Sequence, residues 1–136
     1  MAVMLWVEDS DSDELLMEFA AADTALAGRY EVARSVPEAL DAGIRGMRSG
    51  TPHQLVVVDL RLPGGSGWDV VEGLRDHAAA PRGYVVLTSS NDPVDIAQSE
   101  ALGCAHVQKP YTLEDWRTLV DDLVERLGDA LPSDRA

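Results

Sequence analysis

Short apolar runs alternate with longer stretches of helical periodicity along the chain. Four runs predict buried strands, at residues 3–7, 55–58, 84–87 and 105–107, and a weaker strand is expected near residues 31–33. Strands that alternate with helical segments are typical of βα units around a parallel sheet. The pattern therefore predicts five strands and five helices in strict alternation, an α/β fold.

Helix-start signals lie between these strands. Asp11 with Glu14 resembles a capping box, and an apolar stripe of Leu15, Phe19, Ala22 and Leu26 follows it. A weaker helix is expected to begin near Pro37. The remaining helix starts are Ser66 with Asp69, Asp92 with Pro93, and Thr112 with Asp115, and Gly103 reads as a helix stop.

Polar side chains stand where the apolar runs end. They are Glu8 with Asp9, Asp59, Thr88 and Lys109, the last followed by a proline. In an open parallel sheet, ligands bind in the crevice beyond the carboxyl ends of the strands. Three carboxylates, a hydroxyl and an ammonium in that crevice indicate a metal-assisted site for a phosphoryl group.

Strand order decides which of these residues meet. One common doubly wound order, 2-1-3-4-5, makes the strands before Asp9 and Asp59 neighbours, about 4.8 Å apart. Crowded carboxylates raise one another's pKa unless a cation is present, and an all-oxygen site suits Mg²⁺. Lys109 would lie two strands from Asp59, roughly 10 Å away, a gap that only a long side chain spans.

Composition and charge exclude some classes of function. The 136 residues suit one domain, and 11 Lys plus Arg against 24 Asp plus Glu give a net charge of −13. Such an acidic chain is a poor ligand for nucleic acid or for an anionic membrane. The single Cys104 cannot form an internal disulfide, and no segment resembles a signal peptide or membrane span. We expect a cytoplasmic protein.

Four motifs in order resemble the receiver domains of two-component response regulators, over about residues 4–127. They are V-E-D-S at 7–10, V-V-D-L-R-L-P-G-G-S-G at 57–67, V-L-T-S-S at 86–90 and Q-K-P-Y at 108–111. The resemblance implies a flavodoxin-like (βα)5 fold with helices on both sheet faces. It also implies a receiver domain at residues 1–128, with residues 129–136 a short tail without an output domain.

The resemblance assigns roles to the strand-end residues. Asp59 would be the nucleophile that takes a phosphoryl group from the phosphohistidine of a histidine kinase or phosphorelay protein. Asp9, Asp59 and the backbone carbonyl of Arg61 would bind Mg²⁺, with Glu8 reaching it through water. Lys109 would pair with the phosphoryl group, and Thr88 would move toward it.

The resemblance extends to further positions and fails at one of them, His106. The Lys109–Pro110 bond is expected to be cis. Arg61 and Ser90 fall where the family tunes how long the phosphoryl group survives. His106 stands where the family often has the Phe or Tyr whose ring rotation reports phosphorylation, so its role as a switch stays open. Asp11 and Asp13 are interpreted as helix-start charges rather than metal ligands.

Two other functions remain as alternatives. An aspartyl-phosphate phosphatase of the haloacid dehalogenase type would need a second Asp two residues after Asp59, where this chain has Arg61. A phosphorylation-independent interaction module would keep the receiver shape. Nucleotide binding is rejected because Gly65-Ser66-Gly67 does not complete G-x-G-x-x-G and no P-loop is present.

The signal would leave by protein contact. The routes are a homodimer through the face formed by the last two helices and the last strand, a phosphorelay partner, or a regulated downstream target. The stretch V-E-D-S-D-S-D-E-L-L resembles single-domain regulators that work with bacteriophytochrome kinases.

Overall fold

The computed structural model describes residues 2–76, 80–89 and 92–132. A five-stranded parallel sheet runs through the molecule in the order β2-β1-β3-β6-β7. Its strands are β1 (Met4–Val7), β2 (Tyr30–Ala33), β3 (Leu55–Asp59), β6 (Tyr84–Thr88) and β7 (Ala105–Gln108). In order along the sheet this is the predicted 2-1-3-4-5 arrangement. The flavodoxin-like fold class is therefore confirmed.

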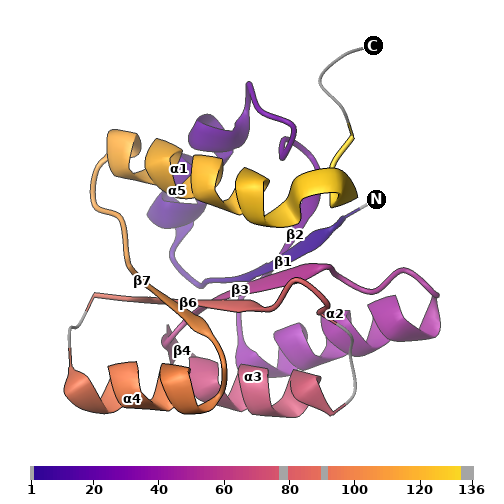
Figure 1. Cartoon of the computed structure of the whole chain (residues 1–136), viewed down its shortest axis with the longest axis vertical. Coiled ribbons are helices and arrows are strands. Elements are labelled where there is room, and N and C mark those ends of the chain that lie inside the picture. Colours follow the sequence, from indigo (N-terminus) through magenta and orange to yellow (C-terminus); the bar gives the residue numbers. More distant parts are fainter. Residues whose placement is uncertain (1, 77–79, 90–91, 133–136) are drawn as a thin grey trace.

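In the described part of the chain, five helices cover the two faces of the sheet. They are α1 (Asp11–Ala21), α2 (Val36–Arg48), α3 (Gly67–Arg75), α4 (Pro93–Ala101) and α5 (Leu113–Leu127), followed by a short 3₁₀ turn at Gly128–Ala130. Figure 1 shows α1 and α5 on one side of the sheet and α2, α3 and α4 on the other. Leu131, after the last turn, still packs into the core.

Two hydrophobic clusters fill the spaces between these layers. Alternate residues of β1 and β3 point to opposite faces, so Trp6 joins the cluster under α1 and α5 while Leu5 joins the one under α2 and α3. Trp6 packs edge-on against Trp116 of α5, with ring centroids 5.7 Å apart. All four residues of β1 and all five of β3 are buried, which is what a central strand covered on both faces requires.

Most helix starts form as the sequence predicts. Reciprocal capping boxes join Ser66 with Asp69 at α3 and Thr112 with Asp115 at α5. The side chain of Asp92 accepts from the backbone N–H of Val94 at the start of α4. These caps satisfy backbone donors that a helix start leaves without partners, and so fix where each helix leaves the strand ends.

Helix α1 differs from its prediction in two ways. Its N-cap is Ser10, whose hydroxyl accepts from the backbone N–H of Asp13, so the Asp11–Glu14 capping box was wrong. The buried face is Met17, Ala20 and Ala21, whereas Leu15 and Phe19 are 52% and 59% exposed. Small alanines let α1 pack closely on the sheet and α5, and Leu15 and Phe19 turn outward.

A short antiparallel pair was not predicted. Strands β4 (Arg61–Leu62) and β5 (Gly65–Ser66) form a hairpin between β3 and α3. Gly67, which follows it, has to be a glycine because a Cβ there would lie 2.5 Å from the backbone oxygen of Asp59. The glycine-rich segment is thus the predicted turn, tightened against the end of β3.

Within the residues that the structure describes, no helix is long and apolar enough to cross a membrane.

We expect Met17→Ala to lower the free energy of unfolding by about 2–4 kcal/mol, because it removes a fully buried side chain. Phe19→Ala should change it by less than about 0.5 kcal/mol, because that ring is largely in solvent. Urea denaturation of the two variants tests the orientation of α1. Equal losses would contradict it.

Candidate functional site

The carboxyl ends of three adjacent strands deliver the predicted polar residues to one place. Asp59 and Thr88 are the last residues of β3 and β6, and Glu8 directly follows β1. All three residues are buried, with at most 5% of the surface of each residue exposed. They line a pocket of about 280 Å³ together with Asp9, Ser10, Asp13, Arg61, Ser89 and Lys109.

Lys109 lies at the centre of this pocket. It follows the edge strand β7, and its backbone N–H donates to the Thr88 carbonyl, 2.8 Å away, which continues the strand pairing by one residue. Its side chain reaches across β6 to Asp59, as the predicted order required, and donates a hydrogen bond to Asp59 Oδ2.

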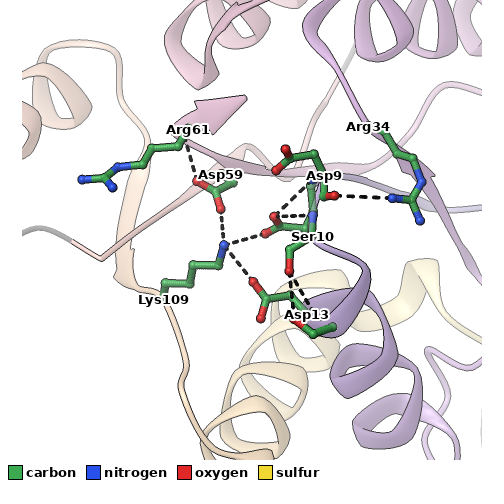
Figure 2. Close-up of polar contacts among 9 residues, drawn as sticks. Asp9, Ser10, Asp13, Arg34, Asp59, Arg61 and Lys109 are labelled. Atoms are coloured by element: carbon green, nitrogen blue, oxygen red, sulfur yellow. Dashed lines mark hydrogen bonds and ion pairs between the residues drawn. The ribbon is translucent and has the colours of Figure 1, made fainter. Parts of the chain in front are cut away.

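The Lys109 ammonium contacts two further carboxylates, as Figure 2 shows. Asp13 Oδ2 lies 2.9 Å from Nζ and Glu8 Oε2 lies 3.0 Å from it. Burial opposes the charged form of Lys109, but its hydrogen bond to Asp59 and its close contacts with Asp13 and Glu8 outweigh this effect and raise its pKa above the usual range. The ammonium therefore stays charged and offsets the acids around it.

Glu8 is strongly perturbed. Its side chain is 1% exposed, and burial together with the negative charge of Asp59 raises its pKa to about 7, against the opposing effect of Lys109. Glu8 Oε1 accepts from the backbone N–H groups of Asp9 and Ser10. Glu8 Oε2 is buried without a well-aligned hydrogen bond, even though the ammonium is close to it.

Asp59 is held on both sides. Its Oδ2 faces Lys109, and its Oδ1 accepts from the backbone N–H of Arg61 at 2.8 Å. The Arg61 side chain is exposed and extends away from the carboxylate (Figure 2). These two contacts hold Asp59 in the pocket. The second residue after it is Arg61, not the second Asp that a phosphatase of the haloacid dehalogenase type would need.

Asp9 lines the pocket, and Arg34 contacts the loop that carries it. Asp9 is exposed and lines the pocket without touching Lys109. Arg34, just after β2, contacts the Asp9 carbonyl at 3.5 Å, lies 2.8 Å from Asp11 and pairs with Glu14. These contacts tie the β1–α1 loop to the neighbouring strand.

Three residues that line the pocket were not predicted as part of the site: Ser10, Asp13 and Ser89. The contacts of Arg34 beside the pocket were not predicted either. Asp13 was interpreted as a helix-start charge, yet its carboxylate turns toward Lys109. Its place in the first turn of α1, one helical turn after Asp9, was the signal that could have revealed it. No sequence signal pointed to Arg34, because its contacts depend on how β2 and α1 lie in space.

Comparison with known proteins identifies the family. The bacteriophytochrome response regulator AtBRR is 33% identical, with a TM-score of 0.62, over 88% of this chain and 90% of that one. The chain belongs to the response regulator receiver domains. The phosphorylated cyanobacterial phytochrome response regulator RcpA is 26% identical (TM-score 0.76), and the Mn²⁺-bound response regulator Rcp1 is 25% identical (TM-score 0.73). Each covers 98% of this chain and 100% of its own. No family model and no curated protein matches the sequence.

The oxygen donors of this receiver domain fit a divalent cation. Asp9 and Asp59 both face the pocket, and Glu8 Oε2 is a buried carboxylate oxygen without an aligned donor. Within residues 2–76, 80–89 and 92–132, no group of three or more acidic, His or Cys side chains is already gathered as a metal cage. Mg²⁺ does not need one, because it keeps several waters and takes one or two carboxylates.

The remaining predicted residues have different outcomes. The Lys109–Pro110 bond is trans, so the expected cis bond was wrong: no cis peptide occurs in the described residues. A trans bond is the intrinsic preference of an X–Pro pair. Ser90 lies outside the described residues. His106 lies opposite Val86 in the sheet, and its Nε2 is buried without a hydrogen-bond partner.

The raised pKa of Glu8 predicts how stability depends on pH in the metal-free receiver domain. Its folded pKa of about 7 exceeds the unfolded value of 4.5, so folding favours its protonated form. This contribution is fully present below pH 4.5 and is lost as the pH rises to about 7. Glu8→Gln should therefore gain about 1–3 kcal/mol relative to the native chain between pH 4.5 and 8.

Urea denaturation at several pH values measures this difference. Glu72→Gln is the matched control, because Glu72 is exposed on α3. It should show no comparable pH-dependent gain. A flat difference between Glu8→Gln and the native chain across this range would contradict the account of Glu8.

Proposed function

We propose that Asp59 accepts a phosphoryl group from the phosphohistidine of a sensor histidine kinase or a phosphorelay protein, with Mg²⁺ as cofactor. The observation that carries the proposal is the Lys109 ammonium, hydrogen-bonded to the buried Asp59 at the carboxyl end of the sheet. An ammonium there can neutralise a phosphoryl oxygen as charge accumulates on it.

The transfer is a displacement at phosphorus. A carboxylate oxygen of Asp59 forms a P–O bond while the P–N bond of the donor imidazole breaks, and the imidazole keeps the electron pair and takes a proton. Asp59 becomes an acyl phosphate, and water later cleaves it to carboxylate and inorganic phosphate. The protein contributes position and electrostatics, as is usual in phosphoryl transfer.

The carboxylates at the strand ends would bind the cofactor. Asp9, Asp59 and the Arg61 carbonyl would hold Mg²⁺, with Glu8 reaching it through water. The bound cation would neutralise the transferring oxygens and relieve the repulsion between the acids. Phosphorylation of RcpA and the Mn²⁺ of Rcp1, both receivers of the same fold, support this assignment.

Two further residues would convert phosphorylation into a signal. We propose that the Thr88 hydroxyl moves to the phosphoryl group and that His106, which lies on the next strand, responds to that movement. Arg61 and Ser90 would tune how long the phosphoryl group survives. His106 Nε2 is buried without a hydrogen-bond partner, which is unfavourable. A change in the surroundings that offers a partner would therefore favour a new orientation of the ring.

The output would be a protein contact, made in the cytoplasm. A groove of about 550 Å³ adjoins the acceptor site, between β7 and α5, and its lining includes Lys109, Pro110, Tyr111 and Leu119. We propose that this surface serves a homodimer or a downstream target. A bacteriophytochrome is a candidate kinase, since AtBRR is a bacteriophytochrome response regulator.

Incubation with acetyl phosphate and Mg²⁺ should add the mass of one phosphoryl group to the intact protein. Asp59→Asn should abolish this addition, because an amide is a poor nucleophile. Asp23→Asn, a change of the same kind at an exposed residue after α1, should leave it intact. Absence of any increment in the native chain at saturating donor would refute the proposed function.

The homodimer is tested by sedimentation velocity. We expect beryllofluoride, a phosphoryl mimic, with Mg²⁺ to raise the sedimentation coefficient of the native chain. Tyr111→Asp should prevent this rise, since Tyr111 is 69% exposed beside the groove, whereas Phe19→Asp on α1 should not. Equal behaviour of the two variants would exclude a dimer through this surface.

A further inference from the structure

Asp13 makes a contact that neither metal binding nor phosphoryl acceptance requires. It lies in the first turn of α1, and its carboxylate is 2.9 Å from Lys109 Nζ. Its side chain is 20% exposed, at the mouth of the pocket, so it is neither enclosed like Glu8 nor fully in solvent.

The helix start does not explain this orientation. In a capping box the Asp13 carboxylate would accept from the Ser10 backbone N–H, but that donor goes to Glu8 Oε1 instead. Asp13 contributes only its backbone N–H to the cap, to Ser10 Oγ. Its carboxylate is thus available for Lys109, as Figure 2 shows.

The ammonium has a limited number of donors. It carries three hydrogens, and three carboxylates surround it: Glu8, Asp13 and Asp59. A phosphoryl group on Asp59 brings new oxygens that also require Lys109. One of the existing contacts has to give way, and Asp13 has no other assigned role in the site.

We propose that Asp13 is a positioning residue that holds Lys109 in the unphosphorylated protein and competes with the incoming phosphoryl group for it. Asp13 thereby favours the unphosphorylated state and sets how much phosphodonor is needed to switch the protein. This inference rests on the proposed function of Asp59. It assigns Asp13 no contact with the metal or the phosphoryl group.

Asp11 provides a matched control. It lies in the same helical turn and carries the same charge, but its side chain is 89% exposed and pairs with Arg34. Asp11→Asn therefore removes one negative charge near the site without changing any contact of Lys109. Asp13→Asn removes the same charge and weakens the contact.

The first measurement is the affinity for beryllofluoride in the presence of Mg²⁺, by calorimetric titration. Asp13→Asn should bind it about two- to fivefold more tightly than the native chain, as expected for loss of one partly exposed ion pair. Asp11→Asn should change the affinity by less than about twofold. Asp13→Glu, which keeps the charge and can still reach Lys109, should return it toward the native value.

The second measurement needs neither metal nor phosphoryl group. Urea denaturation of Asp13→Asn, Lys109→Met and the double variant forms a double-mutant cycle in the metal-free protein. The two changes should be non-additive, whereas Asp11→Asn with Lys109→Met should be additive. This tests the contact itself and detects any variant that fails to fold.

The outcomes separate the two proposals. Suppose that the native chain is phosphorylated by acetyl phosphate and binds beryllofluoride. If Asp13→Asn then has the beryllofluoride affinity of Asp11→Asn, or a weaker affinity than the native chain, the role of Asp13 is overturned and the proposed function stands. Additivity of Asp13→Asn and Lys109→Met also overturns it. If the native chain takes up neither reagent, the proposed function fails, and the inference fails with it.

Discussion

The ion contacts of Lys109 are the interaction on which the rest of the site depends. Glu8 and Asp59 are buried side by side, and carboxylates in that position repel each other and lose hydration. The ammonium of Lys109, which follows the edge strand β7, offsets this repulsion and allows both carboxylates to remain buried. Among the described residues, Lys109 supplies the positive charge that contacts both of these acids.

This arrangement links the buried pocket to the groove on the surface. Lys109 is the first residue of a segment that continues through Pro110 and Tyr111 along the groove between β7 and α5. Any change in what the ammonium binds acts on the residue that begins this segment. The charges inside the pocket and the groove between β7 and α5 thus meet at Lys109, and Asp13 of α1 contacts the same ammonium.

The sequence predicted the sheet, the helix starts at Ser66, Asp92 and Thr112, and the residues at the strand ends, because these depend on local rules. Hydrophobic runs bounded by turns specify strands, and capping residues satisfy backbone donors wherever the chain folds. Strand order then determined that Lys109 would reach Asp59. The positions of the strands, of these helix starts and of the strand-end residues can be predicted without knowing how the side chains pack.

The errors arose where packing decides. Leu15 and Phe19 have the spacing of a buried face, but the space beneath α1 accepts the smaller Ala20 and Ala21. An acidic residue in the first turn, such as Asp13, favours the start of a helix. Only the position of Lys109 in the structure shows that the Asp13 carboxylate contacts the ammonium. The Lys109–Pro110 isomer, expected from family resemblance, likewise depends on surroundings that the sequence does not state.

The most direct test of the account is to locate the phosphoryl group chemically. Borohydride reduces an aspartyl phosphate to homoserine, which peptide mass spectrometry can assign to one position. After treatment with acetyl phosphate and Mg²⁺, we predict homoserine at position 59 alone. Reduction at another acidic residue, or none in protein that carries the phosphoryl mass, would contradict Asp59 as the acceptor that Lys109 serves.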